Sequence, residues 1–501
     1  MASTNNHPLK RIIFPPTATL YLWIPLSVGV VLRVYGISSN SIWYDESLTI
    51  FLTRQPLMNM VSLLTAELNP PLWEILEWFV IRVFMPSEIS FRLLSLISGI
   101  STLIVAHKLL SFFQVDFLRQ FLVMSILSLS PYQIWLAQDA RIYGLMSLVY
   151  LLGFWFIIQQ RWLGMFACFG LILYSNSAGV FFFLSLIIIA LCLYPEKWRM
   201  ILLISCGAVS LFIPWLISSF GNNLSGNYFA GYNIPPVNAQ RVLEQLNNIF
   251  LAASTSNSPL PGLLWIINLF ILIFFFAFVG LFPVFLILRR KINPNSTIRT
   301  NLSVLLTLIF LPLGMIILTA LVYDNGHLIL YRSFSPLSVP LILLISEFSK
   351  FKSKFASAVL IIFLLINLSY HSAWSVQEKG GYLKETLQNL SIPNQPSTII
   401  FHATANSLLP FSYYLNNATH YLLEADLPAG FLIEPLQQTF GLMKISPEQI
   451  PSTSYWIIWA DDAHLPPFVT ESMNNLTKHS LLMGKIAYPQ AATIYIYRAN
   501  P

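Results

Sequence analysis

Two adjacent carboxylates follow the first long apolar stretch of the chain. They are Asp45 and Glu46, in the segment IWYDES at positions 42–47. Charge close to hydrocarbon is costly, so ionisable side chains kept near a membrane surface usually line a polar site or a substrate path. A carboxylate there can take the proton from an attacking hydroxyl. The pair would equally suit a wet loop or the first turn of a helix, where acidic residues are favourable, and these six residues alone leave both interpretations open.

The composition is that of a polytopic membrane protein. Of the 501 residues, 56% are hydrophobic and 10% are charged, whereas soluble domains carry about 25% charged residues. Lys10-Arg11 and the apolar run 18–37 predict an uncleaved signal anchor, because the run is too long for the core of a cleavable leader. The positive-inside rule of membrane proteins is the first explanation for the net charge of +6. We expect no nucleic-acid partner.

The three cysteines predict neither a disulfide nor a zinc site. Cys168, Cys192 and Cys206 all fall inside apolar runs and form no CxxC or Cys/His cluster. We expect them to be core residues.

Apolar runs of about 17 to 25 residues, the length that crosses roughly 30 Å of hydrocarbon, predict about 11 transmembrane helices. The runs are 17–37, 93–112, 117–136, 142–159, 162–176, 179–194, 200–219, 262–288, 301–322, 333–348 and 355–373. The segment 70–84 is short and carries Glu74 and Glu77 one helical turn apart. We predict that it forms a helix outside the membrane that dips toward the bilayer.

The basic residues orient these spans. With the N-terminus in the cytoplasm, the inner loops hold about twice as many basic residues as the outer loops before the tail, as the positive-inside rule requires. Every basic residue on the predicted outer side before the tail is arginine: Arg33, Arg54, Arg82, Arg92, Arg141, Arg241 and Arg332. Arginine presents a planar fork suited to phosphate, although it also snorkels well at membrane interfaces.

The chain divides into two predicted domains. Residues 1–374 form a transmembrane catalytic domain, with a first outer loop at 38–91 that holds membrane-parallel helices. A second outer loop at 220–259, rich in Asn, Gly and Ser, is a lid or binding loop, or a flexible connector. Residues 375–501 are more polar and predict an extracytoplasmic α/β domain with a helix at 382–390 and strands at 397–401, 455–459 and 493–497. Asp461 and Asp462 directly follow a predicted strand. They belong to a functional site or, as the simpler interpretation, to a polar turn.

In this topology, polar residues from separate outer loops converge on one face. They are Asp45, Glu46, Glu67, Glu74, Glu77, Asp139, Arg141, Asn176, Asp324, His327 and Arg332. A wet cavity at the end of a helical bundle suits a substrate with one apolar and one polar end. A lipid-linked phosphosugar has this shape: carboxylates would serve the sugar and the attacking group, and arginines or a metal would stabilise the phosphate as it leaves.

Five short motifs resemble the integral-membrane GT-C glycosyltransferases. They are WYDES at 43–47, NPPL at 69–72, FRLLS at 91–95, SPY at 130–132 with QDARIY at 138–143, and YR at 331–332 before Pro336 and Pro340. In order and spacing they are similar to the polyprenyl-phosphate-sugar-dependent members, which include protein O-mannosyltransferases and lipid A aminoarabinose transferases. The resemblance covers residues 20–350, and the tail only loosely.

The resemblance implies a role for each matching residue. Asp45 matches the aspartate treated as the catalytic base, with Glu46 beside it, and Asp139 matches a second outer acid. Arg141 and Arg332 match basic positions near the donor phosphate, and Tyr143 closes the same motif as Arg141. The resemblance also implies a multi-pass protein of the plasma (inner) membrane.

A divalent metal stays open as a cofactor. Glu67 stands close to a first-loop acid that binds a metal in some members of the family. Many members have histidine in the short outer loop where this chain has YSNS at 174–177, and histidine or another polar residue where it has Asn69. An asparagine carbonyl binds transition metals poorly. Asn176 and His327 remain further candidates for the site.

The sequence therefore predicts an inverting glycosyltransferase. It would move a hexosyl or pentosyl group from a polyprenyl-phosphate donor to a hydroxyl or phosphate of a lipid, glycan or protein on the outer face. The alternative is a transporter or flippase of lipid-linked sugars, but transporters usually place charges near the midplane and show internal repeats. A third interpretation, a receptor or structural protein whose tail does the work, would leave Asp45 dispensable.

Overall fold

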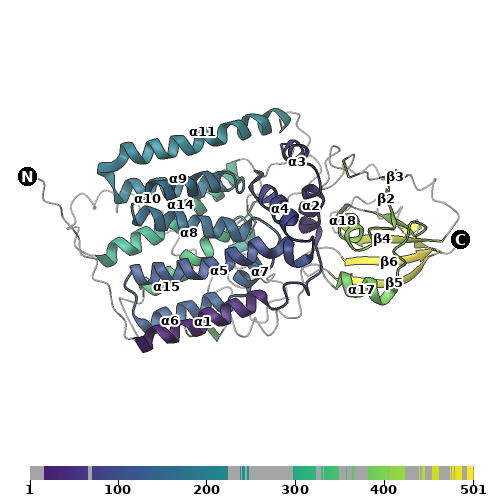
Figure 1. The fold of residues 1–501 in the computed structure, drawn as a ribbon, viewed down its shortest axis with the longest axis horizontal. Coiled ribbons are helices and arrows are strands. Elements are labelled where there is room, and N and C mark those ends of the chain that lie inside the picture. The colour runs from purple at the N-terminus through teal and green to yellow at the C-terminus, as the bar shows by residue number, and fades with distance from the viewer. Residues whose placement is uncertain are drawn as a thin grey trace, which may run out of the picture.

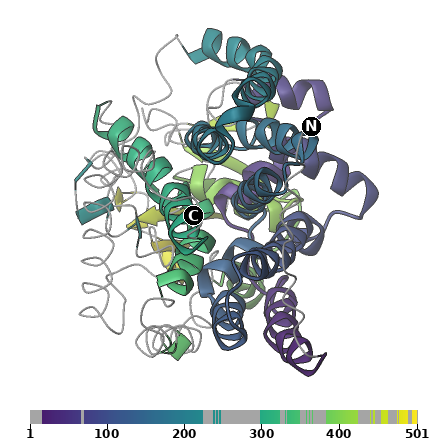
Figure 2. The same cartoon turned by 90° about the vertical axis from the view of Figure 1, so that its left-hand side faces the viewer.

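The computed structural model describes residues 16–65, 70–223, 297–322, 329–330, 332–348, 382–403, 405–423, 443–445, 454–461, 480–487 and 493–499, with a few isolated residues between them. Within these residues, long helices lie side by side, three short helices cover one end of them, and a six-stranded sheet lies beyond the short helices (Figure 1). Figure 2 looks along the long helices and shows them packed around one another.

The helices of the bundle occupy the predicted apolar runs. They are α1 (Pro16–Val34), α5 (Glu88–Phe112), α6 (Phe117–Leu129), α7 (Pro131–Ala137), α8 (Tyr143–Ile158), α9 (Trp162–Leu173), α10 (Gly179–Leu193), α11 (Trp198–Asn223), α14 (Thr297–Val322) and α15 (Ser338–Phe348), with the 3₁₀ turn η4 (Ser335–Leu337) before α15. The predicted span 262–288 lies outside the described residues, as does nearly all of 355–373.

One predicted span is broken. The run 117–136 forms α6 and α7, which meet at an angle of 56°. Pro131 is the cause, because it has no N–H to continue the hydrogen bonds of α6 and cannot extend that helix. Ser130 then caps α7, accepting a hydrogen bond from the backbone N–H of Gln133. This places 138–142, which follows α7, in a turn at the end of the bundle.

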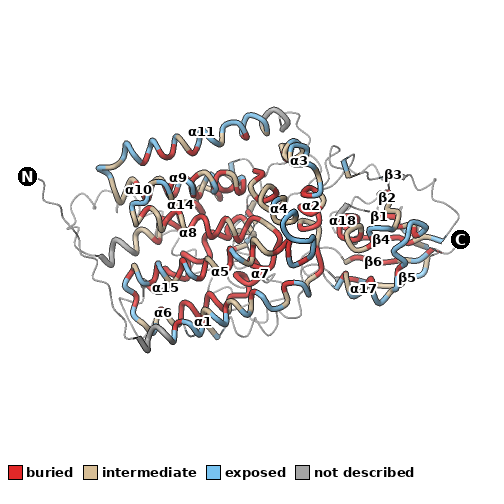
Figure 3. The backbone as a smooth tube through the Cα atoms, in the orientation of Figure 1, coloured by how far each residue is buried: buried red, intermediate tan, exposed pale blue. Residues whose placement is uncertain are grey.

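Three helices in the described part of the chain are long and apolar enough to cross a membrane, and the bent pair α6 and α7 would make a fourth. Several of the other predicted spans form shorter helices, such as α9 with 12 residues and α10 with 15. The structure is therefore that of a helical membrane protein, and it does not establish the predicted number of about 11 spans. Figure 3 shows α11 at the edge of the bundle with much of its surface exposed.

The bundle core is apolar, and some of its polar side chains pair with one another or with the backbone. The hydroxyl of Tyr150 on α8 donates to the carbonyl of Leu308 on α14 at 2.7 Å and lies 2.9 Å from Ser185 Oγ on α10. Cys168 is buried in this core, as predicted, but Cys206 is exposed. Cys206 belongs to α11, many of whose side chains are exposed among the described residues.

The segment predicted as the first outer loop forms the three short helices at the end of the bundle. They are α2 (Tyr44–Thr53), α3 (Leu57–Leu64) and α4 (Leu72–Val83). The helix predicted in 70–84 is confirmed as α4, but its acidic residues Glu74 and Glu77 are both buried. They face protein, because α2 and α5 pack against α4.

The C-terminal region contains a mixed sheet of order β3-β2-β1-β4-β6-β5. Its strands are β1 (Ile399–His402), β2 (Thr419–Leu423), β3 (Met443–Ile445), β4 (Tyr455–Asp461), β5 (Leu481–Ala487) and β6 (Thr493–Ala499), with helices α17 (Leu383–Leu390) and α18 (Ala405–Tyr414). Strand β1 pairs in parallel with β2 and β4, and β6 runs antiparallel to β4 and β5. The predicted helix 382–390 and the three predicted strands are confirmed. Asp461 ends β4, and Asp462 lies outside the described residues.

Candidate active site

Helix α2 positions the two adjacent carboxylates. Asp45 and Glu46 lie in its first turn, after the extended residue Trp43, where acidic side chains interact favourably with the helix dipole. The alternative interpretation of the sequence, that the two acids lie in the first turn of a helix, is therefore confirmed. Successive residues of an α-helix point about 100° apart, so the two carboxylates face different parts of the protein.

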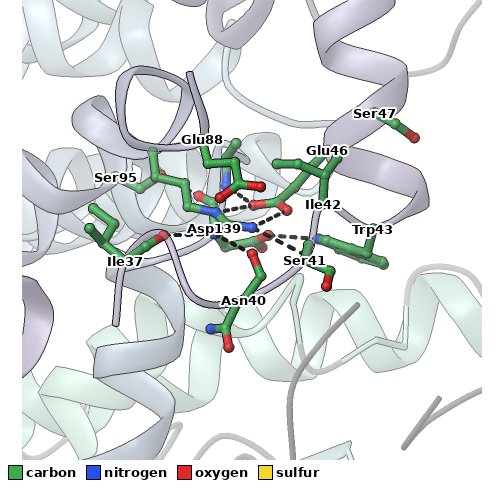
Figure 4. A network of polar contacts seen from close by, with 12 residues as sticks. Ile37, Asn40, Ser41, Ile42, Trp43, Glu46, Ser47, Glu88, Ser95 and Asp139 are labelled. Carbon is green, nitrogen blue, oxygen red and sulfur yellow. Dashed lines mark hydrogen bonds and ion pairs between the residues drawn. The ribbon is translucent and has the colours of Figure 1, made fainter. Parts of the chain in front are cut away.

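Glu46 is buried in a complete ion pair with Arg92 of α5. Arg92 Nε lies 2.9 Å from Glu46 Oε1 and Arg92 Nη2 lies 2.6 Å from Oε2, and both side chains are 0% exposed. The backbone N–H of Ala140 also donates to Oε1 at 2.9 Å. Arg92 Nη1 donates to the carbonyls of Ile37 and Asn40, so this network, drawn in Figure 4, joins three segments. Removing one partner of such a buried pair is strongly destabilising.

Asp139 lies in the turn between α7 and α8 and is buried. Its Oδ1 accepts a hydrogen bond of 3.0 Å from the indole Nε1 of Trp43, which points toward it in Figure 4. Ser95 Oγ of α5 donates to the backbone carbonyl of Asp139. The carboxylate therefore fixes the ring of Trp43 immediately before α2.

Asp45 forms an ion pair with Arg332, through Arg332 Nη1 and Asp45 Oδ2. Unlike the Glu46 pair, this pair is partly open: the side chains of Arg332 and Asp45 are 21% and 19% exposed. Arg141 Nη1 donates to the backbone carbonyl of Asp45 at 3.3 Å and to Thr49 Oγ1 at 3.1 Å. Burial would raise the pKa of Asp45, but the charges of Arg332 and Arg141 outweigh it and hold this pKa below its usual value.

Two aromatic rings flank the guanidinium of Arg332. Its Cζ lies 5.4 Å from the ring centroid of Trp43 and 5.8 Å from that of Tyr143, distances at which a cation is attracted to the ring face. Tyr143 begins α8, and Ser335 Oγ donates to its carbonyl at 3.1 Å. Arg332 is therefore held from several directions while part of its surface stays open.

Two further carboxyls of α4 lie nearby. Burial raises the pKa of Glu74, although the charge of Arg141 opposes this. Glu77 is fully buried, and neither carboxyl oxygen has a hydrogen-bond partner among the described residues. Burial, followed by the charges of Glu74 and Glu46, raises the pKa of Glu77 well above its usual value, so its neutral form is favoured more than in an exposed glutamate.

The remaining predicted site residues are not brought into this cluster. Asn176 is buried, and its Oδ1 accepts a hydrogen bond of 2.9 Å from the N–H of Ala178, so it caps the turn before α10. Glu67, His327 and Asp324 lie outside the described residues. In the part of the chain that is described, no three His, Cys, Asp or Glu side chains form a group able to hold a metal ion. The described residues therefore offer no set of ligands that fits a metal ion, and the candidate ligand Glu67 lies outside them.

Three residues that contact the segment before α2 were not predicted from the sequence. The hydroxyl of Tyr414 on α18 donates to Glu88 Oε1 and accepts from the N–H of Ile42, both at 2.8 Å. Lys384 of α17 forms an ion pair of 3.0 Å with Glu88. The C-terminal domain thus contacts the segment that leads into α2. Arg92 lay within a recognised motif, but no sequence signal marked Tyr414, Glu88 or Lys384.

The chain is similar in fold to ArnT. Two structures of ArnT from Cupriavidus metallidurans, in the apo state and bound to undecaprenyl phosphate, match with 13% and 12% sequence identity and TM-scores of 0.47 and 0.46. Each match covers 97% of this chain and 100% of the ArnT chain. No protein-family model matches the chain, and neither does any curated protein sequence.

Proposed function

We propose that the protein is an inverting glycosyltransferase that moves a sugar from a polyprenyl-phosphate donor to a hydroxyl or phosphate acceptor. The observation that carries this proposal is the partly open cluster of Asp45, Arg332 and Arg141 at one end of an apolar helical bundle. It combines a carboxylate that can accept a proton with two guanidinium groups that can bind a phosphate. The sequence motifs around these residues support the same assignment.

The donor would bind with its lipid against the bundle and its phosphate at the arginines. Guanidinium groups bind phosphate through paired N–H donors. Arg332 and Arg141 reach the same aspartate from different segments, the turn before η4 and the turn before α8. The sugar would then lie beside Asp45.

The reaction is a single displacement at the anomeric carbon. A bond forms between that carbon and the acceptor oxygen, and the bond to the phosphate oxygen breaks, with the electron pair leaving on the phosphate. Asp45 takes the acceptor proton, and the arginines stabilise the negative charge of the leaving group. Alignment of donor and acceptor by the protein supplies several kcal/mol of the barrier reduction.

The neighbouring residues are assigned supporting roles. Glu46 positions α2 through Arg92, and Asp139 positions Trp43. Tyr143 and Trp43 orient Arg332. Asn176 is assigned to the turn that it caps, while His327 and Glu67 remain candidates for contacts with the substrate, with Glu67 as the metal candidate.

The predicted orientation completes the proposal. The distribution of lysine and arginine places the N-terminus in the cytoplasm and residues 375–501, the C-terminal domain, on the outer face of the plasma (inner) membrane. Residues 1–374 are then the catalytic domain, and the transfer takes place on the outer face. The acceptor is a lipid, a glycan or a protein, and the sugar is a hexose or a pentose.

Transfer assays with purified protein test the proposal. Wild type supplied with polyprenyl-phosphate sugars should release polyprenyl phosphate and label an acceptor, and Asp45→Asn should not. Asp116→Asn is the matched control, because Asp116 lies in an exposed pair with Arg119 at the turn between α5 and α6. Transport of the donor by both wild type and Asp45→Asn, with no transfer, would favour the flippase instead.

A further inference from the structure

The ion pair between Asp45 and Arg332 creates a problem for the proposed reaction. A general base works best when its pKa lies near the operating pH. The two arginines instead hold the pKa of Asp45 below the usual value of an aspartate, which makes it a weak base. As long as Arg332 stays on Asp45, the carboxylate is poorly suited to take a proton from an acceptor.

The contacts of Arg332 would allow it to bind a phosphate in place of Asp45. Its guanidinium is flanked by the rings of Trp43 and Tyr143, which hold it through their faces and use none of its N–H groups in that contact. The pair with Asp45 is partly exposed, so an incoming group can reach it. A phosphate offers the same bidentate geometry as a carboxylate and more negative charge.

Asp45 is held independently of Arg332. Arg141 Nη1 donates to its backbone carbonyl and to Thr49 Oγ1, and Glu46, the next residue of α2, is fixed by Arg92. The carboxylate of Asp45 would therefore keep its place when Arg332 leaves it.

We propose that the donor phosphate displaces Asp45 from Arg332, so that the catalytic base is released only when the donor is bound. This inference rests on the proposed function and adds an order of events to it. Before the donor binds, Asp45 occupies the phosphate site on Arg332, and this ion pair makes it a weak base. After the exchange, burial and a lower local positive charge make it a stronger base.

The exchange makes an unusual prediction about binding. The base and the donor phosphate compete for one arginine, so removal of the base should improve donor binding while it abolishes transfer. Asp45→Asn should bind polyprenyl phosphate, the probe without a sugar, roughly fivefold more tightly than wild type, as expected when a partly exposed ion pair no longer has to be broken. The matching polyprenol, which lacks the phosphate, should bind both proteins equally.

Double variants separate exchange from simple charge repulsion. In an Arg332→Gln background, Asp45→Asn should no longer tighten binding, because the shared partner is gone. In the matched Arg141→Gln background the tightening should persist, since Arg141 contacts the backbone of Asp45 and not its carboxylate. Asp139→Asn should not tighten binding, because Asp139 is held by Trp43.

Each outcome decides the matter. Unchanged or weaker binding by Asp45→Asn would overturn the exchange, as would equal tightening with and without Arg332. If Arg332→Gln does not fold, judged by its thermal unfolding, the single variant Asp45→Asn still decides by its affinity. If wild type binds no polyprenyl phosphate at all, it is the proposed function that fails, and not the order of events within it.

Discussion

The two ion pairs that begin at Asp45 and Glu46 are neighbours in sequence and opposites in environment. The pair of Glu46 with Arg92 is 0% exposed and forms hydrogen bonds with the backbone of Ile37, Asn40 and Ala140, whereas the pair of Asp45 with Arg332 is about one-fifth exposed on each side. One pair is closed and holds the structure together. The other is partly exposed, and we propose that the donor phosphate replaces its carboxylate. Of these two adjacent acids, Glu46 therefore positions α2, and Asp45 is the one proposed to take part in the reaction.

The largest expected effect comes from breaking the closed pair. Arg92→Ala leaves the carboxylate of Glu46 buried without its cation, which should lower the free energy of unfolding by about 3–5 kcal/mol. Thermal or denaturant unfolding in detergent measures this. The control Arg119→Ala removes a pair whose acid, Asp116, is half exposed, and it should cost less than about 1 kcal/mol. Equal losses in the two variants would show that Glu46 and Arg92 have no special structural weight.

Breaking the open pair should instead affect the chemistry. Asp45→Asn should lower the rate of sugar transfer by at least roughly 100-fold, the usual contribution of a general base, and leave the unfolding temperature close to that of wild type. Transfer assays and thermal unfolding on the same sample compare the two effects. A stable Asp45→Asn protein with wild-type transfer would remove Asp45 from the reaction.

The third carboxyl, Glu77, sharpens the comparison because no described residue forms an ion pair or a hydrogen bond with its carboxyl oxygens. Its folded-state pKa is raised, so the protein should lose stability as pH rises above the usual pKa of glutamate, about 4.3, and toward the raised value. Each unit of elevation corresponds to about 1.4 kcal/mol. Glu77→Gln should abolish this dependence and be the more stable protein at alkaline pH. If the stability of the two proteins changed in parallel as the assay pH rose from about 5 to about 8, the raised pKa of Glu77 would be contradicted.

The smallest expected effect concerns the contact with the C-terminal domain. Tyr414→Phe removes the hydroxyl that joins Glu88 to the backbone of Ile42, and should lower the free energy of unfolding by about 1–2 kcal/mol. Because this contact precedes α2, the rate of transfer should fall modestly as well. Tyr421→Phe, on strand β2, is the control. Identical behaviour of the two variants would show that the contact does not position the site.

Much of the fold could be predicted from local patterns. Apolar runs located the helices of the bundle, and alternation with β-branched and aromatic residues located β1, β4 and β6, because both signals depend on neighbours in the sequence. The break between α6 and α7 was missed, although Pro131 marked it, because the apolar run continued across the proline. The number of spans could not be established in this way, since several helices are shorter than their runs.

The sequence by itself determined which residue types lie at the end of each span: the acids of α2, the arginine of the turn before α8 and the arginine before η4. It also determined that they follow apolar helices, since hydropathy is a local property. Only the tertiary structure decided which acid meets which arginine. Residue 45 pairs with residue 332 and residue 46 with residue 92 because helix rotation turns adjacent side chains apart and packing brings distant segments together, and no pattern along the chain records either event.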